Sequence, residues 1–253
     1  MKTLTMLMTM LAGIAPLHAE TLSVEPFGVV TVYRHDAAAE TAPRPRDVVL
    51  FLSGDGGWNL GVINMAQRLT GQGATVAGVD IRHYLAQLEQ THSACVSPAD
   101  DLTQLGRKLQ ADATGAPVAP ILVGYSSGAT LVYAALVQAN AGSFKGALSL
   151  GFCPDLDLKK PLCKGAGIGF TPRKDAKGVF KGVNFLPAKS LSGRWISLQG
   201  QLDQVCATAP TVKFVAEVPG ADLVLLPKVG HGYSVERNWV PQYLKAFRDI
   251  AGR

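Results

Sequence analysis

Apolar runs and helix-like stretches alternate along most of the chain. Residues 48–52 form a continuous apolar run, as expected for a strand that is covered on both faces of a parallel sheet. Apolar side chains then recur at helical spacing from Trp58 to Leu69, and a further strand is expected over residues 75–80. This order of elements predicts a βαβ unit.

The alternation continues toward the C-terminus. Further strands are predicted over residues 121–123, 147–152, 195–199 and 223–226. Helices are predicted after Ser97-Pro98, over residues 128–140 and at the C-terminal end. Two short runs, 22–24 and 29–33, are expected to form antiparallel edge strands. The pattern therefore predicts an α/β fold with a mostly parallel sheet and helices on both faces, whose ligands bind at the carboxyl ends of the strands.

The first nineteen residues differ from the rest of the chain. Lys2 is followed by an apolar run over residues 4–14, and polar sequence begins at Glu20. This is typical of a secretory signal peptide over residues 1–19, cleaved near Ala19. The run is well below the roughly twenty residues of a membrane-spanning helix. We expect an exported chain in which residues 20–253 form one domain, with a lid-like insertion over about 153–193, where the regular alternation is lost.

Composition narrows the classes of function. Hydrophobic residues make up 47% and charged residues 17% of the sequence, which indicates a folded domain. The net charge of +5 is too small and too dispersed for a nucleic-acid-binding protein, although it favours approach to anionic lipid. No spacing of Cys and His matches a metal site, and nothing in the sequence calls for a cofactor.

The cysteines point to disulfides. The chain has four, an even number in an exported protein, which predicts two bonds with three possible pairings. The loop between Cys153 and Cys163 is the shortest one to close; the other two cysteines are Cys95 and Cys206.

A candidate nucleophile comes directly after the strand predicted over residues 121–123. The segment Gly124-Tyr125-Ser126-Ser127-Gly128 is a G-x-S-x-G pattern that leads directly into a helix. Glycines on either side permit the sharp strand-to-helix turn that exposes a nucleophilic serine in α/β hydrolases. Ser126 is therefore the predicted nucleophile, and the domain is expected to have the α/β-hydrolase fold.

A serine hydroxyl needs a base, and the base needs an orienting carboxylate. His231 is the only histidine after Ser126, and it lies in a glycine-flanked turn past the last strand. Asp203 comes after the strand at 195–199, at the edge of the sheet expected for the site, whereas Asp222 precedes its strand at the opposite edge. The order Ser126, Asp203, His231 is the one that the fold predicts.

The loop after the strand at 48–52 is rich in glycine. It reads Ser53-Gly54-Asp55-Gly56-Gly57-Trp58. In this fold the oxyanion is bound by the N–H after the nucleophile and by another from such a loop. We assign the oxyanion hole to the N–H of Ser127 and to that of Asp55 or Gly56.

The predicted insertion and its end are basic. A solvated surface explains such a segment, and docking on an anionic bilayer is the alternative. Apolar side chains lie between the charges at Phe170, Val179, Phe180 and Phe185. The basic residues are Lys159, Lys160, Lys164, Arg173, Lys174, Lys177, Lys181, Lys189 and Arg194.

Taken together, these motifs resemble the VirJ/AcvB family of bacterial periplasmic proteins. The resemblance is carried by the leader and by four segments, 54–58, 124–128, 203–206 and 230–232. It implies a periplasmic α/β hydrolase that removes a lysyl or alanyl group from aminoacyl-phosphatidylglycerol at the membrane surface. The cationic substrate favours Asp55 or Asp80 as a carboxylate near the pocket, with Trp58 as a further substrate contact.

Two other functions remain open from the sequence. The same triad supports a general carboxylesterase that acts on small esters. The resemblance to VirJ also implies association with type IV secretion components, so a non-catalytic binding partner is a third interpretation.

Overall fold

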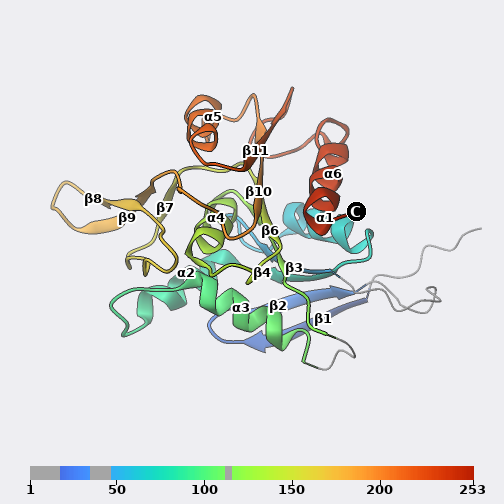
Figure 1. Ribbon diagram of the computed structural model, residues 1–253, viewed down its shortest axis with the longest axis horizontal. Helices are drawn as coiled ribbons and strands as arrows, with labels where there is room; N and C mark the ends of the chain where they lie inside the picture. The colour runs from blue at the N-terminus through green and yellow to red at the C-terminus, as the bar shows by residue number, and fades with distance from the viewer. Residues whose placement is uncertain (1–17, 35–46, 112–115) are drawn as a thin grey trace, which may run out of the picture.

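The computed structural model describes residues 18–34, 47–111 and 116–253 (Figure 1). Most of the predicted signal peptide, residues 1–17, lies outside the described residues, as do residues 35–46 and 112–115. Strand β1 begins at His18, two residues before the predicted start of the mature chain at Glu20.

A central sheet of eight strands organises the domain. Its strand order is β1-β2-β4-β3-β5-β6-β10-β11. The pairs β1·β2 and β2·β4 are antiparallel, and every later pair is parallel. The strands are β1 (His18–Val24), β2 (Gly28–Arg34), β3 (Val48–Leu52), β4 (Thr75–Val79), β5 (Ile121–Tyr125), β6 (Gly146–Leu150), β10 (Arg194–Gly200) and β11 (Ala221–Leu226). The predicted α/β-hydrolase class, with its mostly parallel sheet and antiparallel edge, is confirmed.

Helices cover both faces of this sheet. Helices α1 (Leu60–Thr70) and α6 (Val240–Ala251) lie together on one face, as Figure 1 shows. The other face packs against α2 (Ile81–Gln90), α3 (Pro98–Lys108), α4 (Ser127–Gln138) and α5 (Thr208–Ala216). Strand β3 is fully buried because its side chains alternate between the two cores, with Leu50 on one side and Phe51 on the other. A short 3₁₀ helix, η2 (Glu236–Asn238), precedes α6.

Two helices were not expected from the pattern. Helix α2 buries only Ile81, Tyr84 and Leu88, so its apolar stripe is narrow, and it is begun by the Asp80 side chain, which accepts a hydrogen bond from the Arg82 N–H. Helix α5 has nine residues, of which only three are buried. Short helices with few apolar positions give a weak periodic signal in the sequence, and packing against the sheet is what stabilises them.

The predicted insertion contains a small sheet of its own. Strands β7 (Asp155–Asp157), β8 (Phe170–Lys174) and β9 (Phe180–Phe185) pair antiparallel in the order β7-β9-β8. Figure 1 shows the β8–β9 hairpin projecting from the body of the domain. The segment is attached to α4, where the buried Tyr133 hydroxyl donates to the Leu186 carbonyl and accepts from the Ala188 N–H.

The two disulfides join Cys95 to Cys163 and Cys153 to Cys206. The two predicted bonds are present, and of the three pairings that the sequence left open the structure does not have the one with the shortest loop, Cys153 with Cys163. Closing the shortest loop matters less than proximity in the fold, because Cys153 lies just after β6 and Cys206 lies just after the neighbouring parallel strand β10.

None of the helices in the described ranges is both long enough and apolar enough to cross a membrane.

Candidate active site

Ser126 occupies a sharp turn between β5 and α4. Its backbone has φ of 55° and ψ of −125°, a conformation that costs energy for a residue with a side chain. The flanking glycines make the turn possible. A Cβ on Gly124 would lie 2.2 Å from the Gly128 carbonyl oxygen, and one on Gly128 would lie 2.3 Å from the Ser53 carbonyl oxygen. This is the strained turn that exposes a nucleophile in α/β hydrolases.

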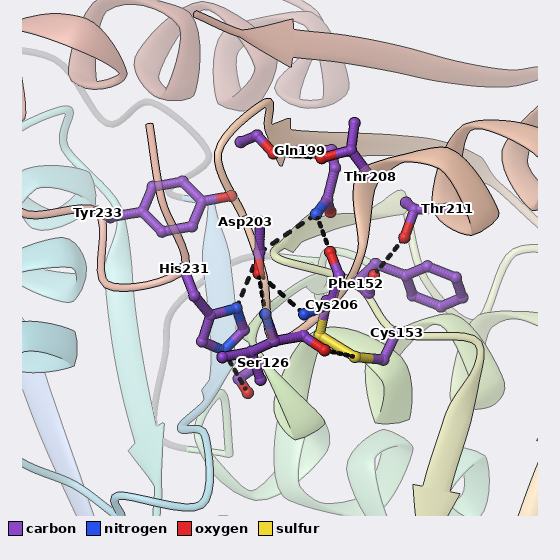
Figure 2. Close-up of polar contacts among 12 residues, drawn as sticks. Ser126, Phe152, Cys153, Gln199, Asp203, Cys206, Thr208, Thr211, His231 and Tyr233 are labelled. Carbon is purple, nitrogen blue, oxygen red and sulfur yellow. Dashed lines mark hydrogen bonds and ion pairs between the residues drawn. A yellow bond between two sulfur atoms is a disulfide. The ribbon is translucent and has the colours of Figure 1, made fainter. Parts of the chain in front are cut away.

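The structure brings Ser126, His231 and Asp203 together, as Figure 2 shows. The Nε2 atom of His231 lies 3.0 Å from the Ser126 Oγ, and its Nδ1 lies 2.8 Å from the Asp203 Oδ2. An ionised carboxylate only accepts hydrogen bonds, so Nδ1 carries the proton and Nε2 is free to accept from the serine hydroxyl. The arrangement has the geometry of a nucleophile, a base and an orienting acid.

The Asp203 carboxylate is fully buried and surrounded by donors. Its Oδ1 accepts from the backbone N–H groups of Val205 and Cys206, at 2.9 and 2.8 Å. Its Oδ2 accepts from the Gln199 Nε2 at 3.2 Å, in addition to His231. These bonds fix the acid in one orientation and compensate for its burial. Gln199 was not predicted, because a buried glutamine near the end of a strand has no recognisable sequence signal.

Aromatic residues hold the turn that carries His231. The Tyr125 hydroxyl donates to the His231 carbonyl oxygen at 3.0 Å, and its ring lies 5.4 Å from the imidazole. Burial raises the pKa of Tyr125, and the nearby Asp203 charge adds to this, so the hydroxyl stays protonated as a donor. Tyr233 is buried behind the turn and donates to the Leu198 carbonyl oxygen at 2.7 Å.

Asp222, the alternative acid, takes no part in this cluster. It lies at the start of β11 and pairs with Arg194 at 2.9 Å. The start of a parallel strand is at the opposite edge of the sheet from the nucleophile, as predicted.

A pocket of about 420 Å³ opens onto Ser126 and His231. The glycine-rich loop forms part of its wall, from Gly54 to Gly57. The Gly57 N–H closes a turn on the Gly54 carbonyl oxygen at 2.8 Å, which leaves Asp55 and Gly56 at the tip of the loop. A Cβ on Gly54 would lie 2.9 Å from the Ser126 Cβ, so glycine is what lets this loop approach the nucleophile closely. The loop therefore has the position expected for an oxyanion hole.

One hydrogen bond joins the two parts of the expected oxyanion hole. The Ser127 hydroxyl donates to the carboxylate of Asp55, a residue of the pocket lining. Both residues are accessible to solvent, and Asp55 is the acidic residue among those that line the pocket. A carboxylate at this position is available to a cationic group.

Trp58 and Asp80 lie outside the pocket lining, contrary to the expected substrate contact. The Trp58 indole packs over Gly78 of β4, where a Cβ would lie 1.9 Å from the ring, and donates to the Tyr33 hydroxyl at 3.3 Å. Asp80 caps α2 and pairs with Arg82 at 2.8 Å, and the hydrogen bond from Arg82 lowers the pKa of this carboxyl. Both residues stabilise the fold next to the site.

Four of the nine basic residues of this segment form ion pairs within the domain. Lys159 pairs with Glu89, Arg173 with both Asp155 and Asp157, Lys181 with Asp175, and Arg194 with Asp222. Two of these acids, Glu89 and Asp222, come from outside the segment. The net positive charge at this surface is therefore smaller than the sequence of the segment indicates. No residue of 153–193 is among those that line the pocket, so this segment does not cover it as a lid would.

Within the described ranges, no group of three or more His, Cys, Asp or Glu residues is arranged to hold a metal ion.

Comparisons with known structures agree with this architecture. Esterase 2 of Thermogutta terrifontis, phosphonylated by sarin, matches with a TM-score of 0.61 at 14% identity, over 94% of this chain and 95% of that one. Est1E from Butyrivibrio proteoclasticus matches with a TM-score of 0.58 at 12% identity, over 93% and 99%. A serine hydrolase without lid from Xanthomonas campestris matches with a TM-score of 0.53 at 18% identity, over 94% and 95%. At these identities the likeness establishes the fold.

No curated protein matches the sequence. A family model does match: residues 46–148 fit the family described as bacterial virulence protein (VirJ). The matched segment runs from β3 to β6 and includes the glycine-rich loop and the Ser126 turn, whereas Asp203 and His231 lie beyond it. The resemblance to VirJ is thus confirmed over residues 46–148.

Proposed function

We propose that this protein is an exported serine ester hydrolase that removes the aminoacyl group from aminoacyl-phosphatidylglycerol. The observation that carries the proposal is the contact of His231 with both Ser126 and Asp203 at the wall of an open pocket. The strain at Ser126 supports it, because such conformations persist where a function requires them.

The positions of these groups suggest a role for each of them in the proposed reaction. The His231 Nε2 takes the proton of Ser126 as its Oγ attacks the ester carbonyl, and Asp203 stabilises the imidazolium that forms. The N–H groups of Ser127 and of Asp55 or Gly56 bind the oxyanion. His231 then gives its proton to the departing glycerol oxygen. In the second half, His231 deprotonates a water that attacks the acyl-enzyme, which releases the amino acid and restores Ser126.

Two features of the pocket suit an aminoacyl lipid. Asp55 places a negative charge beside the nucleophile, where the α-ammonium of an aminoacyl ester would lie. Leu60 and Val205 are exposed at 78% and 69%, and they lie at or next to the lining of the pocket, where they suit contact with apolar parts of a lipid. The two disulfides suit the oxidising compartment in which such a lipid would be reached, the periplasm.

The test is release of amino acid from lysyl- and alanyl-phosphatidylglycerol in liposomes. Wild type is compared with Ser126→Ala and with Asp55→Asn, and p-nitrophenyl acetate serves as a small, uncharged ester. We expect Ser126→Ala to abolish both activities. Asp55→Asn should raise KM for the cationic lipid and leave KM for the small ester unchanged.

The other functions predict different results. Cleavage of the small ester alone, with the lipid untouched, would keep the triad and make the protein a general carboxylesterase. No hydrolysis of either substrate by folded wild-type protein would contradict the enzyme proposal and favour a binding partner of a secretion system.

A further inference from the structure

The disulfide Cys153–Cys206 lies close to the acid of the triad (Figure 2). Cys206 is the third residue after Asp203, and its backbone N–H donates to the Asp203 Oδ1 at 2.8 Å. Its carbonyl oxygen accepts from the Gln199 Nε2 at 2.7 Å, and the same Nε2 also donates to Asp203. The turn of residues 203–206 therefore sets where the carboxylate lies.

The other end of the disulfide is attached to the helix of the nucleophile. The Cys153 carbonyl oxygen accepts from the Thr130 hydroxyl of α4 at 2.7 Å, one turn after Ser126. Next to it, the Phe152 carbonyl oxygen accepts from Thr211 of α5 at 2.9 Å. The pair Phe152 and Cys153 is thus held by two helices, one of which begins directly after the nucleophile.

These hydrogen bonds and the disulfide form a continuous series of contacts that begins and ends at Ser126. From Ser126 it runs along α4 to Thr130, to Cys153, across the sulfur atoms to Cys206, to Asp203, to His231 and back to Ser126. Half of the turn is exposed, with Gln204 and Val205 at the surface, so packing alone would hold it less firmly if the covalent link were absent.

We propose that the Cys153–Cys206 disulfide is a positioning element of the triad, which holds the turn of residues 203–206, and with it the Asp203 carboxylate, in place against His231. The inference rests on the proposed hydrolase function. Cys153 and Cys206 touch no reacting atom; they act through Asp203. A displacement of about 1 Å in such a group lowers the rate up to about a hundredfold.

The second disulfide provides a matched control. Cys95 and Cys163 are 68 residues apart and Cys153 and Cys206 are 53 apart, so both bonds close loops of similar length and constrain the unfolded chain to a similar degree. Cys95–Cys163 joins the segment before α3 to the insertion, and neither residue contacts the triad or lines the pocket.

The experiment compares Cys153→Ala/Cys206→Ala with Cys95→Ala/Cys163→Ala in the whole protein. Both pairs should lower the melting temperature, whereas only the first should lower kcat, about tenfold to a hundredfold, with KM unchanged. Proton NMR gives a readout that does not depend on turnover, namely the low-field signal of the His231 Nδ1 proton shared with Asp203. It should be lost or broadened in the first pair and kept in the second.

Equal losses of kcat in the two pairs, or an unchanged kcat and proton signal in the first pair, would overturn the inference. If the first pair does not fold, Thr130→Val replaces it. This variant removes the hydrogen bond to Cys153 at nearly constant volume, and it should lower kcat without changing KM; an unchanged kcat and proton signal would overturn the inference. If wild type hydrolyses no ester, the proposed function is wrong but the inference about the disulfide is still tested. The proton signal then decides whether the disulfide positions Asp203.

Discussion

Asp203→Asn is the substitution that most directly tests how the site is arranged. The Oδ1 side of the carboxylate faces two backbone N–H groups, so an asparagine retains its oxygen there. Its NH₂ group then faces the His231 Nδ1 and the Gln199 Nε2, which both donate to Asp203 in the native site. The imidazole responds by accepting through Nδ1, which moves its proton to Nε2. With Nε2 protonated, His231 no longer accepts the proton of Ser126.

The size of the effect is set by this change of tautomer. A wrong tautomer in a Ser-His-Asp site, with geometry otherwise intact, lowers kcat about 10⁴-fold, which corresponds to about 5 kcal/mol of lost transition-state stabilisation. Stability should fall much less, because the two backbone N–H groups keep their acceptor and the Gln199 amide keeps the Cys206 carbonyl. The loss should be about 1 kcal/mol, as for one impaired hydrogen bond.

Steady-state hydrolysis of a p-nitrophenyl ester measures kcat, and urea unfolding measures stability. Asp222→Asn is the matched control, since it neutralises an exposed carboxylate that pairs with Arg194 at the opposite edge of the sheet, and its kcat should equal that of wild type. If Asp203→Asn kept kcat within about tenfold of wild type, the role assigned to Asp203 would be wrong. A loss of kcat accompanied by global unfolding would refute the claim that the effect is local.

Three further substitutions test the surroundings of the site. Gly151→Ala should lower both kcat and the unfolding free energy, the latter by about 1–3 kcal/mol, because Gly151 has φ of 66° and a Cβ would lie 3.2 Å from the His231 ring. Gly78→Ala should destabilise the fold by about 1–3 kcal/mol in urea unfolding, since its Cβ would overlap the Trp58 ring at 1.9 Å. Asp80→Ala removes the α2 cap and should cost about 1 kcal/mol at pH 7. The hydrogen bond from Arg82 lowers the pKa of Asp80 below its ordinary 3.8, so this contribution is present above pH 3.8 and is lost as pH falls through the folded-state value. The cost of Asp80→Ala should therefore shrink in acid.

Each of these expectations has an outcome that contradicts it. Wild-type turnover in Gly151→Ala would mean that the His231 ring tolerates displacement. An unchanged unfolding free energy in Gly78→Ala would mean that Trp58 moves away without cost. A cost of Asp80→Ala that is the same at pH 3 and pH 7 would mean that the charge of Asp80 does not contribute; Asp80→Asn, which keeps a capping oxygen, is the control.

Local chemistry accounts for the parts of the fold and site that could be predicted. Buried parallel strands such as β3 are apolar throughout, so they are visible in the sequence. Gly124 has no room for a Cβ because of the Gly128 backbone in the same five-residue turn, so the turn at Ser126 is visible as a local motif. Helices α2 and α5 were missed because packing on the sheet, which no local pattern records, stabilises them. Gln199 was missed for a related reason. Its amide reaches Asp203, four residues later, only because a turn brings the carboxylate back toward the strand.

By itself the sequence determined the fold class, the strained turn at Ser126 and the choice of Ser126, Asp203 and His231 as the side chains that come together. These depend on periodicity, on glycine at positions without room for a Cβ, and on the residue types found just after each strand. Only the tertiary structure decided the disulfide pairing, the ion pairs of four of the nine basic residues, and the structural roles of Trp58 and Asp80. The physical reason is that these features depend on distances between residues far apart in the chain. Chain separation favours Cys153 with Cys163, whereas the sheet places Cys153 against Cys206.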